Sequence, residues 1–161
     1  MKHINARTEI LKSNEIAEFL TDHLPYRIKI LNNIISYPNK VNTDPLWPSI
    51  YESAQITCRM FIQFFGLRVN GNHNPELKPA QDYYSKDGIK SYEVKIKDLG
   101  FDFVQLNDLT KSEQEILAHA YESGNRATAH LTYRTSFDPD PGKVIQAAKL
   151  IRKIIQDKLS I

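Results

Sequence analysis

The stretch from Thr110 to Arg134 constrains the fold most, because two unlike faces can be drawn on it if it forms one helix. Residues three and four apart share a helical face. One such line is apolar or small and should face the core: it comprises Ile116, Ala120, Gly124, Ala127 and Leu131. A second line carries the groups that could do chemistry: Glu115, His119, Glu122, Arg126, His130 and Tyr133. The stretch therefore predicts a long helix whose reactive groups face outward.

The start of this helix is marked more clearly than its end. Thr110 followed three residues later by Glu113 is a capping-box pattern ahead of an apolar-periodic run. Gly124 interrupts the run, because glycine costs about 1 kcal/mol relative to alanine inside a helix and often marks a helix end. Either the helix stops there, or the glycine lets another helix approach closely. We favour continuation, because the apolar line stays in phase across Gly124.

Helical spacing of apolar residues predicts further helices on both sides. One helix should begin at Ser13 and end near His23, and Pro25 suits the first turn of a second; the two could equally be one kinked helix. The next should open around residues 44–49 and stop at Gly66. Its apolar stripe suits the middle of a bundle and comprises Trp47, Ile50, Tyr51, Ala54, Cys58, Phe61 and Phe65. The last helix has a core stripe of Val144, Ala148, Ile151, Ile155 and Leu159, with basic residues opposite.

The segment before the long helix should contain the β-structure. Residues 68–91 are expected to be an irregular loop, because turn-forming pairs such as Asn70-Gly71, Asn74-Pro75 and Asp87-Gly88 crowd it. Residues 91–106 alternate apolar and polar side chains around Gly100, which predicts a β-hairpin leaning on the helices. The expected fold is mainly α: a four- or five-helix bundle with a β-hairpin inserted before the fourth helix, in a single domain over residues 1–161.

Length and cysteine usage limit the class of protein. A chain of 161 residues fits one domain, and about two-thirds of its unfolded surface could be buried. Cys58 is the only cysteine, which excludes an intrachain disulfide and a Cys-based metal site. Because it lies on an apolar stripe, we interpret it as a small buried hydrophobe rather than a nucleophile. The sequence shows neither a membrane span nor a signal-peptide core, so a cytoplasmic location is expected.

Charge and motif content exclude several functions. The net charge of +2 is too balanced to imply a nucleic-acid partner by itself. Glycine-rich phosphate loops are absent from the sequence, and so are the paired Glu-x-x-His motifs of carboxylate-bridged metal sites. We therefore expect no cofactor and no metal.

The segment Asn125-Arg126-Ala127-Thr128-Ala129-His130 resembles the motif of the HEPN superfamily. Its members are helical bundles that include the ribonuclease toxins of prokaryotic defence and toxin–antitoxin systems. They carry an arginine beside a polar residue, followed by a histidine, on a late helix. Arg126 would correspond to that arginine, His130 to the histidine and Asn125 to the polar position. The chain departs from the pattern in two ways: its arginine–histidine gap is one residue short, and its Asn-Arg order is reversed.

The resemblance implies an RNA-associated or defence-linked module that is at most a metal-independent ribonuclease, with two sites facing each other across a homodimer. Such cleavage needs a proton donor or acceptor that works near neutral pH, which histidine supplies. It also needs a fixed positive charge on the phosphate, which the planar fork of arginine supplies. His130 would be the acid or base and Arg126 the phosphate ligand. His119 or Tyr133 could assist from one turn away.

A structural interpretation of the same residues remains open. An arginine and a histidine on one helical face, beside Glu115 and Glu122, also have the spacing of a salt-bridge ladder, in which Arg126 pairs with Glu122. The protein would then be a non-enzymatic module that dimerises or binds a partner protein, with Arg126 and His130 serving stability.

Overall fold

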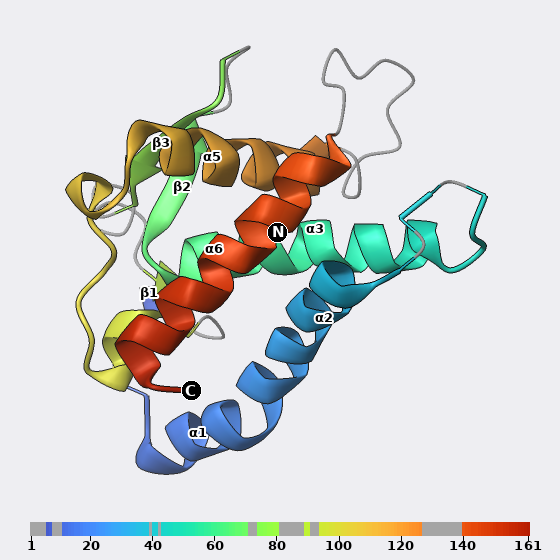
Figure 1. Cartoon of the computed structure of the whole chain (residues 1–161). Helices are drawn as coiled ribbons and strands as arrows, with labels where there is room; N and C mark the ends of the chain where they lie inside the picture. The colour runs from blue at the N-terminus through green and yellow to red at the C-terminus, as the bar shows by residue number, and fades with distance from the viewer. Residues whose placement is uncertain are drawn as a thin grey trace, which may run out of the picture.

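We describe the fold from a computed structural model of the chain. The structure describes residues 6–7, 11–38, 40–41, 43–70, 74–80, 89–90, 94–126 and 140–161. Its helices pack around one apolar core, and a two-stranded antiparallel hairpin lies between α3 and α5 (Figure 1). The predicted fold class, a mainly helical bundle with a hairpin before the fourth helix, is confirmed.

The first helical segment runs without a break from Ser13 to Ser36. It consists of α1 (Ser13–Glu18), a π-helical turn, η1 (Phe19–His23), and α2 (Leu24–Ser36). The carboxylate of Glu15 accepts a hydrogen bond from the backbone N–H of Lys12 at 2.7 Å, which satisfies a donor at the helix start. Glu18 and His23 keep right-handed helical backbone angles. Of the two predicted alternatives, one helix with a change of direction is therefore correct (Figure 1).

α3 (Trp47–Phe64) is the central helix and contacts α2, α5 and α6. All members of its predicted apolar stripe are buried or half-buried. Cys58 is completely buried, and burial raises the pKa of its thiol to about 12. The predicted role of Cys58 as a buried hydrophobe is confirmed, because a thiol that stays protonated is a poor nucleophile. α3 ends where Gly66 takes a positive φ of 81°, as its sequence position predicted.

The predicted place of the hairpin is wrong. β2 (Leu67–Asn70) pairs antiparallel with β3 (Glu76–Pro79), and all but the first residue of this pair lies in the segment 68–91, which was expected to be an irregular loop. In the segment expected to be the hairpin, Ile96–Leu99 instead form a short 3-10 helix. The side chain of Asp98 closes that turn by accepting from the backbone N–H of Lys95 at 2.7 Å, and Gly100 ends it with a φ of 87°.

A second strand pair is minimal: β1 (Ala6–Arg7) pairs with β4 (Ile89–Lys90). Backbone hydrogen bonds tie the longer hairpin and its neighbours to the end of α3. The N–H of Ala80 donates to the carbonyl of Gly66 at 2.8 Å, and the N–H of Val104 donates to that of Phe65 at 3.1 Å. The turn at Gly66 is thus the point where the β-structure joins the helices.

The last two helices complete the bundle. α5 (Lys111–Arg126) packs on α3 and α6, and α6 (Pro141–Leu159) packs on α2, α3 and α5. Asp140 caps α6, because its side chain accepts from the backbone N–H groups of Gly142 and Lys143 at 2.8 and 3.4 Å. The predicted core stripe of this helix is confirmed, with Val144, Ala148, Ile151 and Ile155 fully buried and Leu159 half-buried.

Candidate functional site

The start of α5 follows the capping box read from the sequence. The carboxylate of Glu113 accepts from the backbone N–H of Thr110 at 2.8 Å and from its hydroxyl at 2.9 Å. In return, the backbone N–H of Glu113 donates to the Thr110 hydroxyl at 3.2 Å. These bonds, the backbone one above all, hold the pKa of Glu113 below its usual value. The predicted helix start is confirmed.

α5 winds through Gly124 and reaches Arg126. α3 approaches it closely there: a Cβ atom on Gly124 would lie 2.7 Å from the backbone oxygen of Gln55 and 3.0 Å from Cβ of Arg59. Both parts of the favoured interpretation are confirmed, since the helix continues past the glycine and the glycine admits a neighbouring helix.

The structure describes only part of the predicted site. Asn125 is half-buried on the last turn of α5. The backbone of Arg126 ends α5, whereas the side chain of Arg126 and the whole of His130 and Tyr133 lie outside the described residues. The predicted juxtaposition of Arg126 and His130, and the predicted pairing of Arg126 with Glu122, therefore remain predictions.

For two residues of the predicted outward line, the expected orientation is wrong. His119 is 9% exposed and Glu122 is 3% exposed, while Glu115 faces solvent as expected. The reason is that α5 lies against both α3 and α6, so the neighbouring helices cover more than one of its faces. The Nε2 atom of His119 accepts a hydrogen bond from the backbone N–H of Asp140 at 3.2 Å. His119 thus holds the start of α6 in place.

A polar seam joins α3 to α5. It consists of Gln55, Arg59 and Gln63 on α3 with Tyr121 and Ser123 on α5. Gln55, 1% exposed, donates through Nε2 to the hydroxyl of the fully buried Ser123. Gln63 donates to the Tyr121 hydroxyl at 3.2 Å, and the Arg59 guanidinium lies 5.8 Å from the centre of the Tyr121 ring. Side chains bonded to one another in this way fix the rotation of α5 against α3.

Sequence reasoning missed this seam as a unit. Helical spacing predicts that Glu52, Arg59 and Gln63 share one polar face of α3, but this prediction includes neither Gln55 nor the partners on α5. A signal was present, because Gln55, Arg59 and Gln63 follow one another at intervals of four residues on a helix that also carries a continuous apolar stripe. A polar line of that spacing on a buried helix indicates partners on a neighbouring helix.

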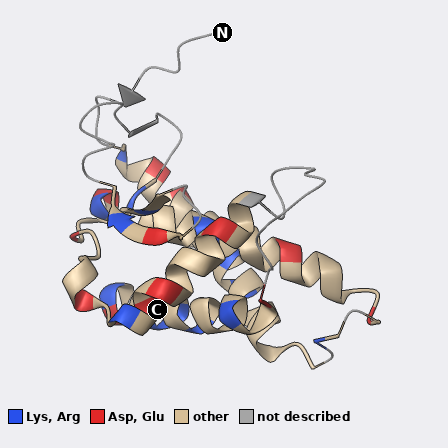
Figure 2. Cartoon of the chain, turned by 90° about the horizontal axis from the view of Figure 1, so that it is seen from above, with Lys and Arg blue, Asp and Glu red and all other residues tan. Residues whose placement is uncertain are grey.

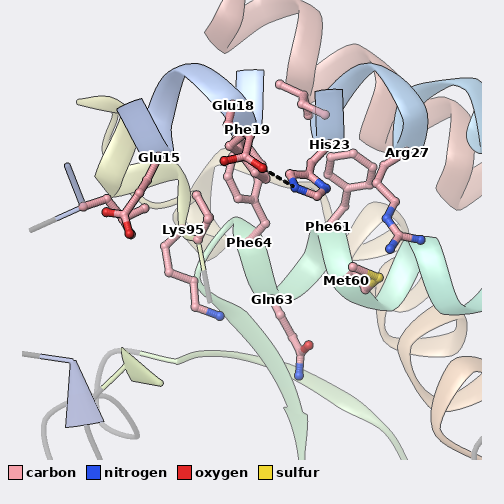
Figure 3. Close-up of a pocket in the computed structure, with 13 residues that line it drawn as sticks. Glu15, Glu18, Phe19, His23, Arg27, Met60, Phe61, Gln63, Phe64 and Lys95 are labelled. Carbon is pink, nitrogen blue, oxygen red and sulfur yellow. Dashed lines mark ion pairs between the residues drawn. The ribbon is translucent and has the colours of Figure 1, made fainter. Parts of the chain in front are cut away.

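The second feature of interest is a groove between the first helical segment and the C-terminal half of α3, which we call the π-turn groove (Figure 3). Its volume is about 500 Å³. Its apolar lining includes Leu24, Phe19, Phe61, Phe64 and Met60, and its charged lining comprises Glu15, Glu18, Arg27 and Lys95, with His23 beside them. No feature singled out from the sequence pointed to this groove, because its two walls are far apart in the chain.

The aromatic residues of the groove stack on one another. The rings of Phe19 and Phe64 are stacked with centroids 5.7 Å apart, and the rings of Phe61 and Phe64 meet edge to face at 6.1 Å. Phe61 and Phe64 are buried and Phe19 is half-buried, so the rings form a floor that an apolar group can cover. Met60, 40% exposed, lies beside them at the mouth.

Comparison with known protein families, with curated proteins and with solved structures finds no match to this chain. Among the helices that the structure describes, none is both long enough and apolar enough to cross a membrane. Among all residues that the structure describes, no three His, Cys, Asp or Glu side chains lie close enough together to hold a metal ion.

The position of His119 leads to a first testable prediction. His119→Ala should lower the free energy of unfolding by about 1 kcal/mol, because the N–H of Asp140 loses its acceptor at the start of α6. Urea denaturation measures the change. His23→Ala is the matched control: its side chain is 64% exposed, and the substitution should change stability by less than about 0.5 kcal/mol. Equal stability of wild type and His119→Ala would contradict the structural role.

Proposed function

We propose that the protein is an RNA-associated helical bundle of the HEPN type, in which Asn125, Arg126 and His130 handle a phosphate group. The course of α5 carries this proposal. It keeps helical geometry through Gly124 to Arg126, which is the condition the sequence motif depends on. A further turn of helix would place His130 on the same face as Arg126, because residues four apart are neighbours on a helix.

The surroundings of the last turn of α5 favour a fixed site. The polar seam holds α5 on α3 immediately before Arg126, and Gly124 keeps the two backbones close. α6 begins near the same end of α5 and carries the exposed Lys143 in its first turn (Figure 1). Phosphate chemistry depends on groups held in place, so the rigid attachment of this turn supports the proposal.

Charge elsewhere does not suggest an extended nucleic-acid surface. Basic and acidic residues are interspersed over the described helices in Figure 2. With charges distributed in this way, the protein should contact few RNA phosphates. Its affinity for RNA should therefore fall only slightly as the salt concentration rises. The proposed activity is metal-independent cleavage, with His130 moving a proton and Arg126 holding the phosphate. In this proposal the protein is a homodimer, as the resemblance implies.

The proposal is tested by incubating single-stranded RNA with the full chain in the presence of a metal chelator. We expect cleavage that falls at least about 100-fold in His130→Ala, which loses the proton-transfer group, and in Arg126→Ala, which loses the positive charge on the phosphate. His23→Ala and Arg68→Ala are the controls: each removes a side chain of the same type, histidine or arginine, from an exposed position, and both variants should cleave RNA as wild type does. If the wild type binds RNA without cleaving it, and only Arg126→Ala weakens this binding, the protein is RNA-associated but is not a ribonuclease. Wild type that neither cleaves nor binds RNA would overturn the proposal.

A second candidate function is a non-enzymatic interaction module, and one observation favours it. His119 and Glu122 of the predicted outward line are turned inward, and His119 supports α6. If the side chains of Arg126 and His130 are also buried against neighbouring helices, they stabilise the fold and do not bind RNA. In that case His130→Ala should lower the free energy of unfolding by well above about 1 kcal/mol and leave RNA unaffected, whereas an exposed catalytic histidine contributes less than about 0.5 kcal/mol.

A further inference from the structure

The π-turn groove has a wall that is unusual in its backbone. In η1 the backbone N–H of Leu24 bonds to the carbonyl of Phe19, five residues back, instead of four. Such π-helical turns are rare and occur frequently at functional sites. The turn supplies Phe19 and His23 to the groove directly.

The π turn has a geometric consequence for the groove. Among the residues of the first helical segment that line it, four follow one another at intervals of four: Glu15, Phe19, His23 and Arg27. In a regular α-helix, each step of four residues rotates the side chain by about 40° beyond a full turn about the helix axis. Over three such steps the last side chain would no longer point toward the groove. The π turn in the middle has more residues per turn, so a step of four residues there rotates by less than a full turn and offsets part of this rotation. All four side chains can therefore face the same groove (Figure 3).

The charges in the groove are not equivalent. The carboxylate of Glu15 accepts the N–H of Lys12, and Oε1 of Glu18 lies 3.9 Å from Nε2 of His23. Arg27 is half-buried, and its guanidinium lies over the ring of Tyr26 at 5.3 Å. Within the part of the chain that the structure describes, no carboxylate forms an ion pair with Arg27. The groove therefore combines an aromatic floor with an arginine whose charge is not neutralised by any carboxylate among the described residues.

We propose that the π-turn groove binds a small apolar carboxylate, with its apolar body on Phe19, Phe61 and Phe64 and its carboxylate on Arg27. The volume of about 500 Å³ suits a small molecule, since such sites span about 300–1,000 Å³. The planar fork of arginine matches a carboxylate with two parallel hydrogen bonds. Glu15 and Glu18 at the rim disfavour ligands with several negative charges, such as RNA or polyphosphates. This site is independent of the RNA proposal.

Calorimetric titration of the full chain tests the ligand class. Decanoate and naphthalene-2-carboxylate are the probes. Naphthalene-2-carboxamide, which lacks the negative charge, and acetate, which lacks the apolar body, are the controls. We expect one saturable site for both probes, affinity for the amide at least about tenfold weaker, and no measurable binding of acetate. Equal affinity for the acid and the amide, or no saturable binding of either probe, would overturn the proposal.

Two matched pairs of variants locate the site. Arg27→Gln should weaken binding of both probes at least about tenfold, whereas Lys29→Gln, which removes an exposed charge from the same helix, should not change it. Met60→Glu should abolish binding by placing a carboxylate at the mouth. Ile56→Glu makes the same change one turn earlier on α3, at a residue that is 43% exposed and outside the groove, and should bind as wild type does. Equal affinities within both pairs would place the ligand elsewhere and refute the assignment. RNA cleavage or binding should be the same in all four variants.

Discussion

Gly124→Ala is expected to destabilise the protein by about 2 kcal/mol, although alanine is the better helix former. Inside an isolated helix the substitution would gain about 1 kcal/mol. Here the added Cβ would lie 2.7 Å from the backbone oxygen of Gln55, and a backbone atom cannot move aside as the end of a side chain can. The α3 and α5 backbones would have to separate, and we expect this overpacking to cost about 3 kcal/mol, the upper end of its usual range, because the clash is with backbone; the helical gain offsets about 1 kcal/mol of it. Urea denaturation at neutral pH measures the net change.

The sign of this change is what distinguishes packing from helix propensity. Ser112→Ala, at an exposed position in the first turn of the same helix, should alter stability by less than about 0.5 kcal/mol. If Gly124→Ala were more stable than wild type, the close approach of α3 would be disproved. Separation of the two helices should also weaken the hydrogen bond between Gln55 and Ser123. RNA activity, if it depends on the position of Arg126, should fall in the same variant.

Gly66→Ala is expected to have the largest effect, about 3 kcal/mol of destabilisation. A φ of 81° costs a residue with a Cβ about 1–2 kcal/mol. The new Cβ would also overlap the ring of Phe103, which adds an overpacking cost of about 1–3 kcal/mol. Both effects act at the turn where α3 meets the hairpin. Thermal and urea denaturation measure the loss.

Gly100→Ala separates the two causes. Gly100 has a φ of 87°, nearly that of Gly66, but a Cβ at this position has no neighbour within 4 Å. Its alanine variant should lose only the backbone part, about 1–2 kcal/mol. Equal losses in the two variants would show that Phe103 moves away without cost. A Gly66→Ala variant as stable as wild type would contradict the described turn.

Elements with strong local signals were predicted well. The capping box of Thr110 and Glu113 and the stop of α3 at Gly66 each depend on contacts within a few residues. Such contacts form whatever the rest of the chain does, so the sequence is enough to find them.

The hairpin shows where local patterns fail. Alternating apolar and polar residues in 91–106 satisfy a strand pattern, but Asp98 bonds back to Lys95 and the segment closes into a turn. Conversely, the turn formers of 68–91 include the connection between β2 and β3, and the strands on either side have only four residues each. Strands this short carry little periodicity, and their pairing becomes visible only when both strands are placed against α5 and β2 also against α3.

For the described part of the candidate site, the sequence alone determined which residues share a helix: periodicity placed Glu115, His119 and Glu122 in one line and carried the helix through Gly124. It could not determine which way that line turns, because a helix has the same internal hydrogen bonds whatever its rotation about its own axis. The packing of α5 against both α3 and α6 decided that His119 and Glu122 point inward. The π-turn groove was likewise decided by tertiary structure, because its floor and its arginine come from two helices and meet only when those helices pack.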